Sequence, residues 1–130
     1  MQIIGLGTDI VETERISGVL AGFGSHFKER ICTASELAAA EKKKDQNSYF
    51  AGRWAAKEAA AKALGCGIGS KCAFTDIEIS NDHSGRPVMT FSGAAAAEAA
   101  ALGVSDIKVS ISHERHYAAA TVILCGKNPH

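Results

Sequence analysis

The sequence predicts an α+β domain in which helices pack on one face of a mainly antiparallel sheet. Two observations predict this class. Runs of apolar and β-branched residues open the chain, occur as a pair around a polar, glycine-containing loop, and return near its end. Segments with helical spacing of apolar residues, capping residues and terminal glycines lie between these runs. The resulting order, β-α-α-α-β-β-α-β-β, is typical of an α+β domain.

A strand opens the chain and a helix follows it. Residues 3–10 are apolar and β-branched, and the two glycines among them allow another backbone to approach closely. Apolar residues then recur at helical spacing from near Thr13, and this helix is predicted to end at Gly22 or Gly24.

Two further helices are predicted in the first half. Thr33 begins a Thr-Ala-Ser-Glu capping box that opens a helix through about Lys43. The next helix is capped by Asn47 or Ser48, and it stops at Gly65, because glycine is the usual residue just beyond a helix end.

The second half of the chain turns to strands. Residues 74–80 and 87–91 flank a polar loop, residues 81–86, and therefore predict a hairpin. The remaining elements are an Ala-rich helix that Ser92 can cap, an alternating strand, a polar turn and a final β-branched strand, at residues 92–102, 107–111, 113–116 and 117–124.

The composition predicts a single domain, residues 1–130, with balanced charge. Lysine plus arginine equal aspartate plus glutamate at 14 each, so no net field favours nucleic acid or an anionic membrane as a partner. No apolar stretch approaches the ~18 residues of a membrane span, and no secretory leader is recognised, so we expect a cytoplasmic protein. The cysteines lack metal-type spacing and are expected to be reduced thiols rather than a zinc site or disulfides.

The helix that ends at Gly65 carries the most informative pattern. Residues three and four apart share one face of a helix, so its charged residues are predicted to form one broad polar stripe, made of Arg53, Lys57, Glu58 and Lys62. The alternative is an ordinary solvated helix in which the Glu58 and Lys62 pair contributes about 0.2–0.5 kcal/mol.

Two carboxylates point to a metal site. Asp9 stands at the end of the first strand, and Glu58 lies mid-helix among alanines. Mg²⁺ binds a few hard oxygen ligands together with waters and substrate phosphates, so this pair, with Lys62 one turn further on, suits a phosphate-bound Mg²⁺. On spacing alone, a turn or helix-capping carboxylate is the favoured explanation of Asp9.

Separate segments resemble one family, in the right order along almost the whole chain. They are residues 5–16, which begin Gly-Leu-Gly-Thr-Asp; 50–65, which contain Trp-Ala-Ala-Lys-Glu; 85–87, Gly-Arg-Pro; and 110–113, Ser-Ile-Ser-His, followed by 117–120. They closely resemble the holo-acyl-carrier-protein synthases, the small bacterial 4′-phosphopantetheinyl transferases. The resemblance implies their fold and their reaction. In that reaction coenzyme A donates 4′-phosphopantetheine to a serine of apo acyl carrier protein, in support of fatty acid biosynthesis, and adenosine 3′,5′-bisphosphate is released.

The resemblance also implies catalytic roles. Asp9 and Glu58 are the expected Mg²⁺ ligands, and Lys62 is expected to balance charge on the β-phosphate. The base that deprotonates the incoming serine is either Glu58 or a metal-bound water.

Recognition of the coenzyme is implied for a second set of residues. Arg53 and His113 are expected to contact the 3′-phosphate, and the turn of Gly85, Arg86 and Pro87 is expected to lie against the adenine. The alternatives are a surface cation for Arg53 and an ordinary turn residue for His113.

An acidic carrier protein is the implied partner, so a locally basic surface is expected despite the neutral total. Arg15 matches the family position that pairs with the carrier helix, Lys28 extends the basic patch, and Phe23 or Phe27 provides an apolar anchor. The family also implies a homotrimer with sites between subunits.

Two functions of other classes are alternatives to the phosphopantetheinyl transferase. A non-catalytic module that holds coenzyme A or an acidic helical partner would share the basic residues but would not require both Asp9 and Glu58. A different Mg²⁺-dependent phosphohydrolase would need a dedicated water-activating group or a P-loop, and no Gly-x-x-x-x-Gly-Lys-Ser/Thr motif occurs.

Overall fold

The computed structural model describes residues 1–127. Its elements follow the predicted order, with a short 3₁₀-helix, η1, added before the second strand. They are β1 Gln2–Glu12, α1 Thr13–Ile31, α2 Ala34–Ala40, α3 Gln46–Leu64, η1 Phe74–Asp76, β2 Ile77–Asn81, β3 Pro87–Phe91, α4 Gly93–Leu102, β4 Val104–His113 and β5 Tyr117–Gly126.

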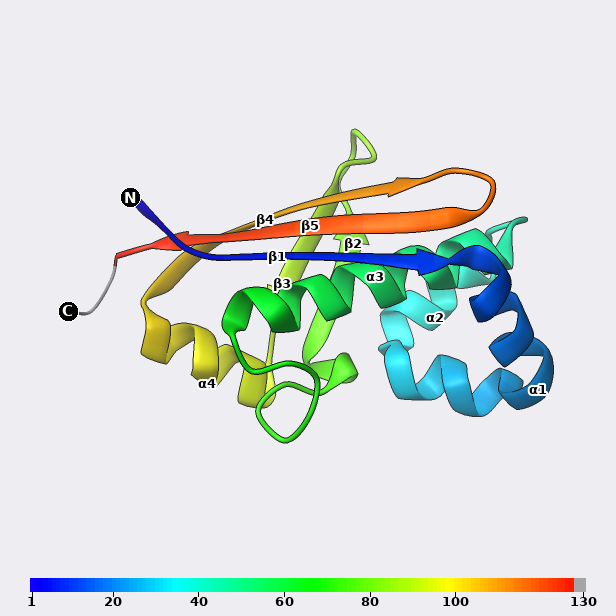
Figure 1. The fold of residues 1–130 in the computed structure, drawn as a ribbon, viewed down its shortest axis with the longest axis horizontal. Helices are drawn as coiled ribbons and strands as arrows, with labels where there is room; N and C mark the ends of the chain where they lie inside the picture. Colours follow the sequence, from blue (N-terminus) through cyan, green and yellow to red (C-terminus); the bar gives the residue numbers. More distant parts are fainter. Residues whose placement is uncertain (128–130) are drawn as a thin grey trace.

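The strands form two antiparallel sheets. One has the order β1-β5-β4, and the other is the β2-β3 hairpin. Figure 1 shows the helices on one side of the three-stranded sheet, with the hairpin crossing behind it. The predicted fold class is confirmed, and the division of the strands between two sheets is a detail that the element order did not specify.

Helix α3 is the centre of the fold. Most of its residues are buried, and it packs against β1, β5 and β4. The approach is close because α3 presents alanines and β1 presents glycines. A Cβ added to Gly5 would overlap the carbonyl oxygen of Ala63, and one added to Gly7 would overlap that of Ala59. The predicted role of these glycines, to admit another backbone, is therefore confirmed.

Aromatic rings fill the space between α3 and the elements that follow the first strand. The Trp54 ring lies 5.8 Å from the Phe27 ring and 5.0 Å from the Phe74 ring, centroid to centroid. These pairs join α1, α3 and η1 in one apolar cluster, where offset aromatic contacts add to the burial of apolar surface.

Helix α1 is longer than predicted. The expected end at Gly22 or Gly24 is wrong, because the helix continues to Ile31 through a kink at Gly24, whose φ is 10° and ψ is −99°. Phe27 and Ile31, four residues apart, are both buried. Their burial on one face stabilises a second helical segment that the glycines hid from a local pattern.

The helix caps agree with prediction in one case and differ in others. Thr33 forms the complete capping box with Glu36, as expected, although α2 ends at Ala40 rather than near Lys43. Helix α3 is capped by Asp45, whose carboxylate accepts from the Ser48 backbone N–H, and not by Asn47 or Ser48.

Two predictions next to the hairpin, the start of its first strand and the cap of the helix that follows it, are wrong. The strand predicted from residue 74 begins at Ile77, because the preceding turn is η1. Ser92 occupies the cap position of α4, but its hydroxyl bonds the Asp76 carbonyl while the Asp76 carboxylate accepts from the Ala95 N–H. The cap of α4 is thus supplied from another element.

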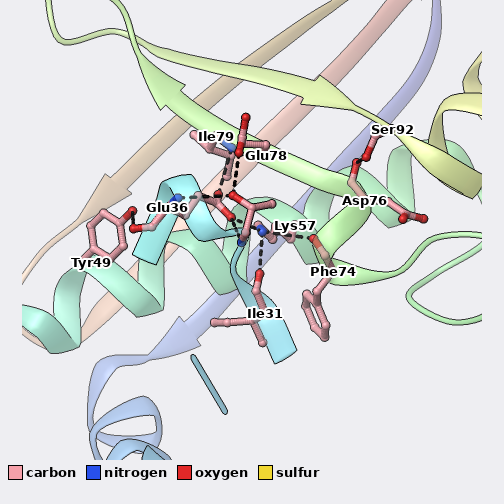
Figure 2. Close-up of polar contacts among 10 residues, drawn as sticks. Ile31, Glu36, Tyr49, Lys57, Phe74, Asp76, Glu78, Ile79 and Ser92 are labelled. Carbon is pink, nitrogen blue, oxygen red and sulfur yellow. Dashed lines mark hydrogen bonds and ion pairs between the residues drawn. The ribbon is translucent and has the colours of Figure 1, made fainter. Parts of the chain in front are cut away.

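The interior contains an ion pair that is shielded from solvent. Lys57 Nζ lies 2.6 Å from Glu36 Oε1, and both side chains are fully buried. Lys57 also donates to the Ile31 and Phe74 carbonyls, while Glu36 accepts from the backbone N–H groups of Thr33 and Ile79. Figure 2 shows how these bonds join α1, α2, α3, η1 and β2 at one point.

The other face of the three-stranded sheet is left uncovered by the helices. Leu6 and Ile10 point to this face from β1 and are 61% and 67% exposed. Their partners in the ladder are Ile123 and Ala119 of β5. No helix among residues 1–127 is both long enough and apolar enough to cross a membrane.

Candidate functional site

The residues predicted to act together lie on two different sides of α3. An α-helix turns by about 100° per residue, so Arg53 and Lys62 are roughly 180° apart around its axis. Lys57 is buried near the Arg53 side, whereas Glu58 is only partly buried and lies near Lys62. The single polar stripe predicted for this helix is therefore wrong. One half-site contains Asp9, Glu58 and Lys62, and the other contains Arg53.

The first half-site lies where β1 passes over α3. Lys62 Nζ donates to the Thr8 carbonyl at 2.9 Å and contacts Asp9 Oδ1 at 3.1 Å. Asp9 and Lys62 line a depression together with residues 119–121 of β5, the middle strand of the sheet. The predicted proximity of Lys62 to the carboxylates is thus present within one chain.

The pKa of the Glu58 carboxyl is raised. Partial burial is the largest cause and the charge of Asp9 is the next, while Lys62 and Arg15 act in the opposite direction. Desolvation and a neighbouring like charge both disfavour the ionised carboxyl. The two carboxylates therefore repel each other, and a bound cation would relieve that repulsion.

The donor set fits Mg²⁺. Among residues 1–127 no group of three or more histidine, cysteine, aspartate or glutamate side chains is gathered in a metal-binding arrangement. Two carboxylates are nevertheless sufficient for Mg²⁺, which retains several waters and is usually completed by substrate phosphates. Asp9 and Glu58 would supply the hard oxygen ligands, and Lys62 the neighbouring positive charge.

The second half-site is a cleft of about 380 Å³ between the start of α3, the β2-β3 hairpin and the end of β4. Cationic and hydrogen-bonding groups dominate its polar lining. The cleft is lined by Lys43, Lys44, Asp45, Ser48, Tyr49, Gly52, Arg53, Asn81, Gly85, Pro87, Ile111 and His113.

Arg53 is held firmly in this cleft. Its guanidinium carbon lies 4.5 Å above the centroid of the Tyr49 ring, and its Nη2 donates to Asn81 Oδ1 at 3.3 Å. The side chain is only 8% exposed, and its Nε has no hydrogen-bond partner among the described residues. A buried guanidinium with a free donor is suited to an anion. The surface-cation alternative for Arg53 is wrong.

The structure brings most of the predicted coenzyme contacts together. Arg53, Gly85, Pro87 and His113 line the same cleft, although they come from three different parts of the chain. Arg86 is exposed and does not line the cleft; its backbone N–H donates to Asp82 instead.

Only some of the residues predicted to contact the partner are exposed. Arg15 is exposed near the start of α1 and close enough to Glu58 to lower its pKa. Lys28 is half-buried, with its ammonium 5.2 Å from the centroid of the Phe50 ring. The prediction of Phe27 as an apolar anchor for the partner is wrong, because its ring is buried against Trp54. Phe23, the other predicted anchor, is 69% exposed.

Several cleft residues were not assigned from the sequence. Lys43 and Lys44 belong to a basic run that indicates a phosphate site in general terms. Tyr49 and Asn81 gave no such signal, because an aromatic residue in a helix and an asparagine before a turn are ordinary. Their roles appear only when α3 and the hairpin are seen together.

A family model identifies the fold. The model of the 4′-phosphopantetheinyl transferase superfamily matches residues 5–122. The chain therefore belongs to this superfamily, which confirms the family predicted from the sequence.

Curated relatives and solved structures agree with this assignment. The chain is 51% identical to a holo-[acyl-carrier-protein] synthase of Vibrio parahaemolyticus over 95% of its own length and 98% of that protein. Its fold is similar to the crystal structure of the Neisseria meningitidis synthase, with a TM-score of 0.89, 36% identity and coverage of 95% and 98%. It is also similar to a Helicobacter pylori synthase in complex with coenzyme A, with a TM-score of 0.82, 34% identity and coverage of 92% and 99%.

Proposed function

We propose that this chain, as one domain of residues 1–130, transfers 4′-phosphopantetheine from coenzyme A to a serine of apo acyl carrier protein, in support of fatty acid biosynthesis. The observation that carries the proposal is the similarity to holo-[acyl-carrier-protein] synthases over almost the whole of both chains. The Helicobacter structure, a complex with coenzyme A, supports coenzyme A as the donor.

The reaction is a displacement at phosphorus. The serine oxygen forms a bond to the β-phosphorus of coenzyme A, the bond from that phosphorus to the bridging oxygen breaks, and adenosine 3′,5′-bisphosphate leaves. Mg²⁺ bound by Asp9 and Glu58 would neutralise charge on the pyrophosphate. Lys62 adds a fixed positive charge beside Asp9. The proton of the serine hydroxyl would pass to Glu58 or to a metal-bound water.

The cleft around Arg53 is proposed as the site for the 3′-phosphoadenosine part of the coenzyme. Lys44, Arg53 and His113 provide cationic or hydrogen-bonding groups for the 3′-phosphate. Gly85 and Pro87 provide a turn with little side-chain bulk against which a flat base can lie.

The carrier protein is proposed to dock along α1. Arg15 is exposed beside Glu58, so a carrier helix paired with it would present its serine to the first half-site. Arg30, Lys28 and the exposed Phe23 extend the same helix as basic and apolar contacts. Complementary charge of this kind accelerates association with an acidic partner.

We also propose that three copies assemble and that each site forms between two of them. Arg53 and Lys62 lie on opposite sides of α3. A coenzyme bound at the Arg53 half-site of one copy would therefore reach the Lys62 half-site of a neighbouring copy more directly than the Lys62 half-site of its own chain. The uncovered sheet face, with Leu6 and Ile10 exposed, offers an apolar surface for that contact.

To test the activity, the protein is incubated with apo acyl carrier protein, coenzyme A and Mg²⁺, each at a concentration typical of the cytoplasm. The intact mass of the carrier is then measured. A mass gain of one phosphopantetheine is expected, and it should require the metal. A carrier of unchanged mass would contradict the proposed function.

A further inference from the structure

We propose that Asn81 is a positioning residue. It links Arg53, which is proposed to bind the 3′-phosphate, to the turn at Gly85, which is proposed to lie against the adenine. Asn81 ends β2, and its partner in the hairpin ladder is Pro87. Its side chain bonds in two directions. Oδ1 accepts from Arg53 Nη2 at 3.3 Å, and Nδ2 donates to the Gly85 carbonyl at 2.9 Å. This inference rests on the proposed function and deepens it.

The chemistry of the two partners fixes the orientation of the Asn81 amide. A guanidinium only donates hydrogen bonds, so it must face the amide oxygen, and a backbone carbonyl only accepts, so it must face the amide nitrogen. A carboxylate at this position would supply acceptors only. A single-atom hydroxyl would be too short to span both partners. The side chain therefore acts as a two-ended bridge.

Arg53 depends on this bridge for its direction. The contact with the Tyr49 ring holds the guanidinium over that ring, but it engages no particular N–H of the group. The Asn81 oxygen accepts from Nη2, and Nε has no partner among the described residues. The Asn81 contact thus decides which edge of the guanidinium remains free for a phosphate.

The turn at the other end of the bridge is already ordered. Asp82 Oδ1 accepts from the Ser84 N–H, the Ser84 hydroxyl and the Arg86 N–H, at 2.9, 2.6 and 3.0 Å. Gly85 has a φ of 88°, which favours glycine. Asn81 ties this preformed turn to α3, so the spacing between the phosphate contact and the base contact is set before a ligand binds.

The test compares two probes, adenosine 3′,5′-bisphosphate and adenosine 5′-monophosphate, by titration calorimetry. The Kd of the monophosphate divided by the Kd of the bisphosphate measures recognition of the 3′-phosphate. This Kd ratio is insensitive to a uniform loss of folded protein. In Asn81→Ala this ratio is expected to fall roughly fivefold, because one bond that orients a charged donor is lost. Binding of the monophosphate should weaken about twofold to threefold through the loosened turn.

Arg53→Ala provides the decisive background. The Kd ratio should fall by at least about tenfold in Arg53→Ala, and adding Asn81→Ala should not change it further, because Asn81 acts on the phosphate only through Arg53. The monophosphate should still bind more weakly in the double variant. Additive changes in the ratio would overturn the inference.

Asn47→Ala is the matched control, since Asn47 does not line the cleft, and it should leave both Kd values unchanged. Asn81→Asp is isosteric and covers a failure of Asn81→Ala to fold. It should lower the Kd ratio at least as far, because its charge offsets that of Arg53. An unchanged ratio in either variant, or loss of folding in both, would overturn the role of Asn81. If the wild type transfers phosphopantetheine normally, the proposed function survives that result, whereas an inactive wild type overturns the function itself.

Discussion

The ammonium of Lys57 lies 2.6 Å from a carboxylate oxygen of Glu36, and neither side chain is accessible to solvent. Lys57 immediately precedes Glu58, so this ion pair fixes the rotation of α3 at the residue next to the proposed metal ligand. The pair also holds α2 and the β2 backbone through the bond from the Ile79 N–H to Glu36. Stability and the geometry of the site are therefore linked at this point.

Removing one member of the pair should be strongly destabilising. In Lys57→Met, Glu36 is left as a buried charge without its cation, and the free energy of unfolding should fall by about 3–5 kcal/mol in urea titrations. Removing both charges in Glu36→Leu with Lys57→Met should recover part of this loss. Lys108→Met removes the exposed partner of Asp106 and should cost less than about 1 kcal/mol. Similar losses for the buried and exposed lysines would contradict the assigned role.

The contact between β1 and α3 should not tolerate a methyl group. In Gly7→Ala, the added Cβ would overlap the Ala59 carbonyl, so the strand must move away from the helix. We expect a loss of about 1–3 kcal/mol or more in the free energy of unfolding. Gly18→Ala in α1 is the control, because nothing lies within 4 Å of the new Cβ. It should raise stability by about 0.5–1 kcal/mol, and a Gly7→Ala protein of wild-type stability would disprove the close contact.

Metal dependence should require both carboxylates. Asp9→Asn and Glu58→Gln are each expected to lower kcat by about 100-fold or more, because charge stabilisation by a metal contributes several kcal/mol. The carrier mass assay, run over a range of Mg²⁺ concentrations, measures the effect. Circular dichroism should report an intact fold. A variant that turns over at the normal rate in saturating Mg²⁺ would remove that residue from the metal site.

Stability without metal should depend on pH through Glu58. Its pKa is raised from the ordinary value of 4.5 by burial and by Asp9, so the folded chain holds this proton more tightly than the unfolded chain. The ionised group therefore lowers stability above the raised pKa, and this loss is relieved as the pH falls through it towards the ordinary value.

In a chelator, Glu58→Gln should consequently be more stable than wild type near neutral pH. The difference should shrink as the pH is lowered to about 4, where the wild-type carboxyl is largely protonated in both states. Urea unfolding at a series of pH values measures it. Parallel pH profiles for the two proteins would show that Glu58 is not under strain from its surroundings.

At a coenzyme A concentration too low to saturate Arg53→Ala, mixing two impaired variants should restore activity if the site forms between subunits. Arg53→Ala retains Asp9, and Asp9→Asn retains Arg53, so random assembly of equal amounts should leave about a quarter of the shared sites intact. The variants are mixed after mild dissociation and assayed by carrier mass. Each variant alone provides the control. A mixture no more active than its components would place the complete site within one chain.

Local patterns in the sequence were sufficient for the order and type of the elements. The Thr33 capping box, the stop at Gly65 and the glycines of β1 each act over a few residues, and each was found where it was predicted. The spacing of Glu58 and Lys62 by four residues is likewise a local property. The expected position of Asp9 at the end of the first strand is wrong, because β1 continues to Glu12, and Asp9 meets Lys62 only because β1 packs on α3.

Other features depended on residues distant in the sequence. The kinked continuation of α1 is stabilised by burial of Phe27 and Ile31, which the glycines before them concealed. Lysine is usually a surface residue, yet Lys57 is buried, because Glu36 and carbonyls from other elements accept the hydrogen bonds of its ammonium. Asn81 meets Arg53 only because the hairpin packs beside α3. Helical periodicity alone places Arg53 and Lys62 on opposite sides of α3. Burial and pairing are decided by contacts between elements, so the tertiary structure determined what each charged residue of α3 contacts.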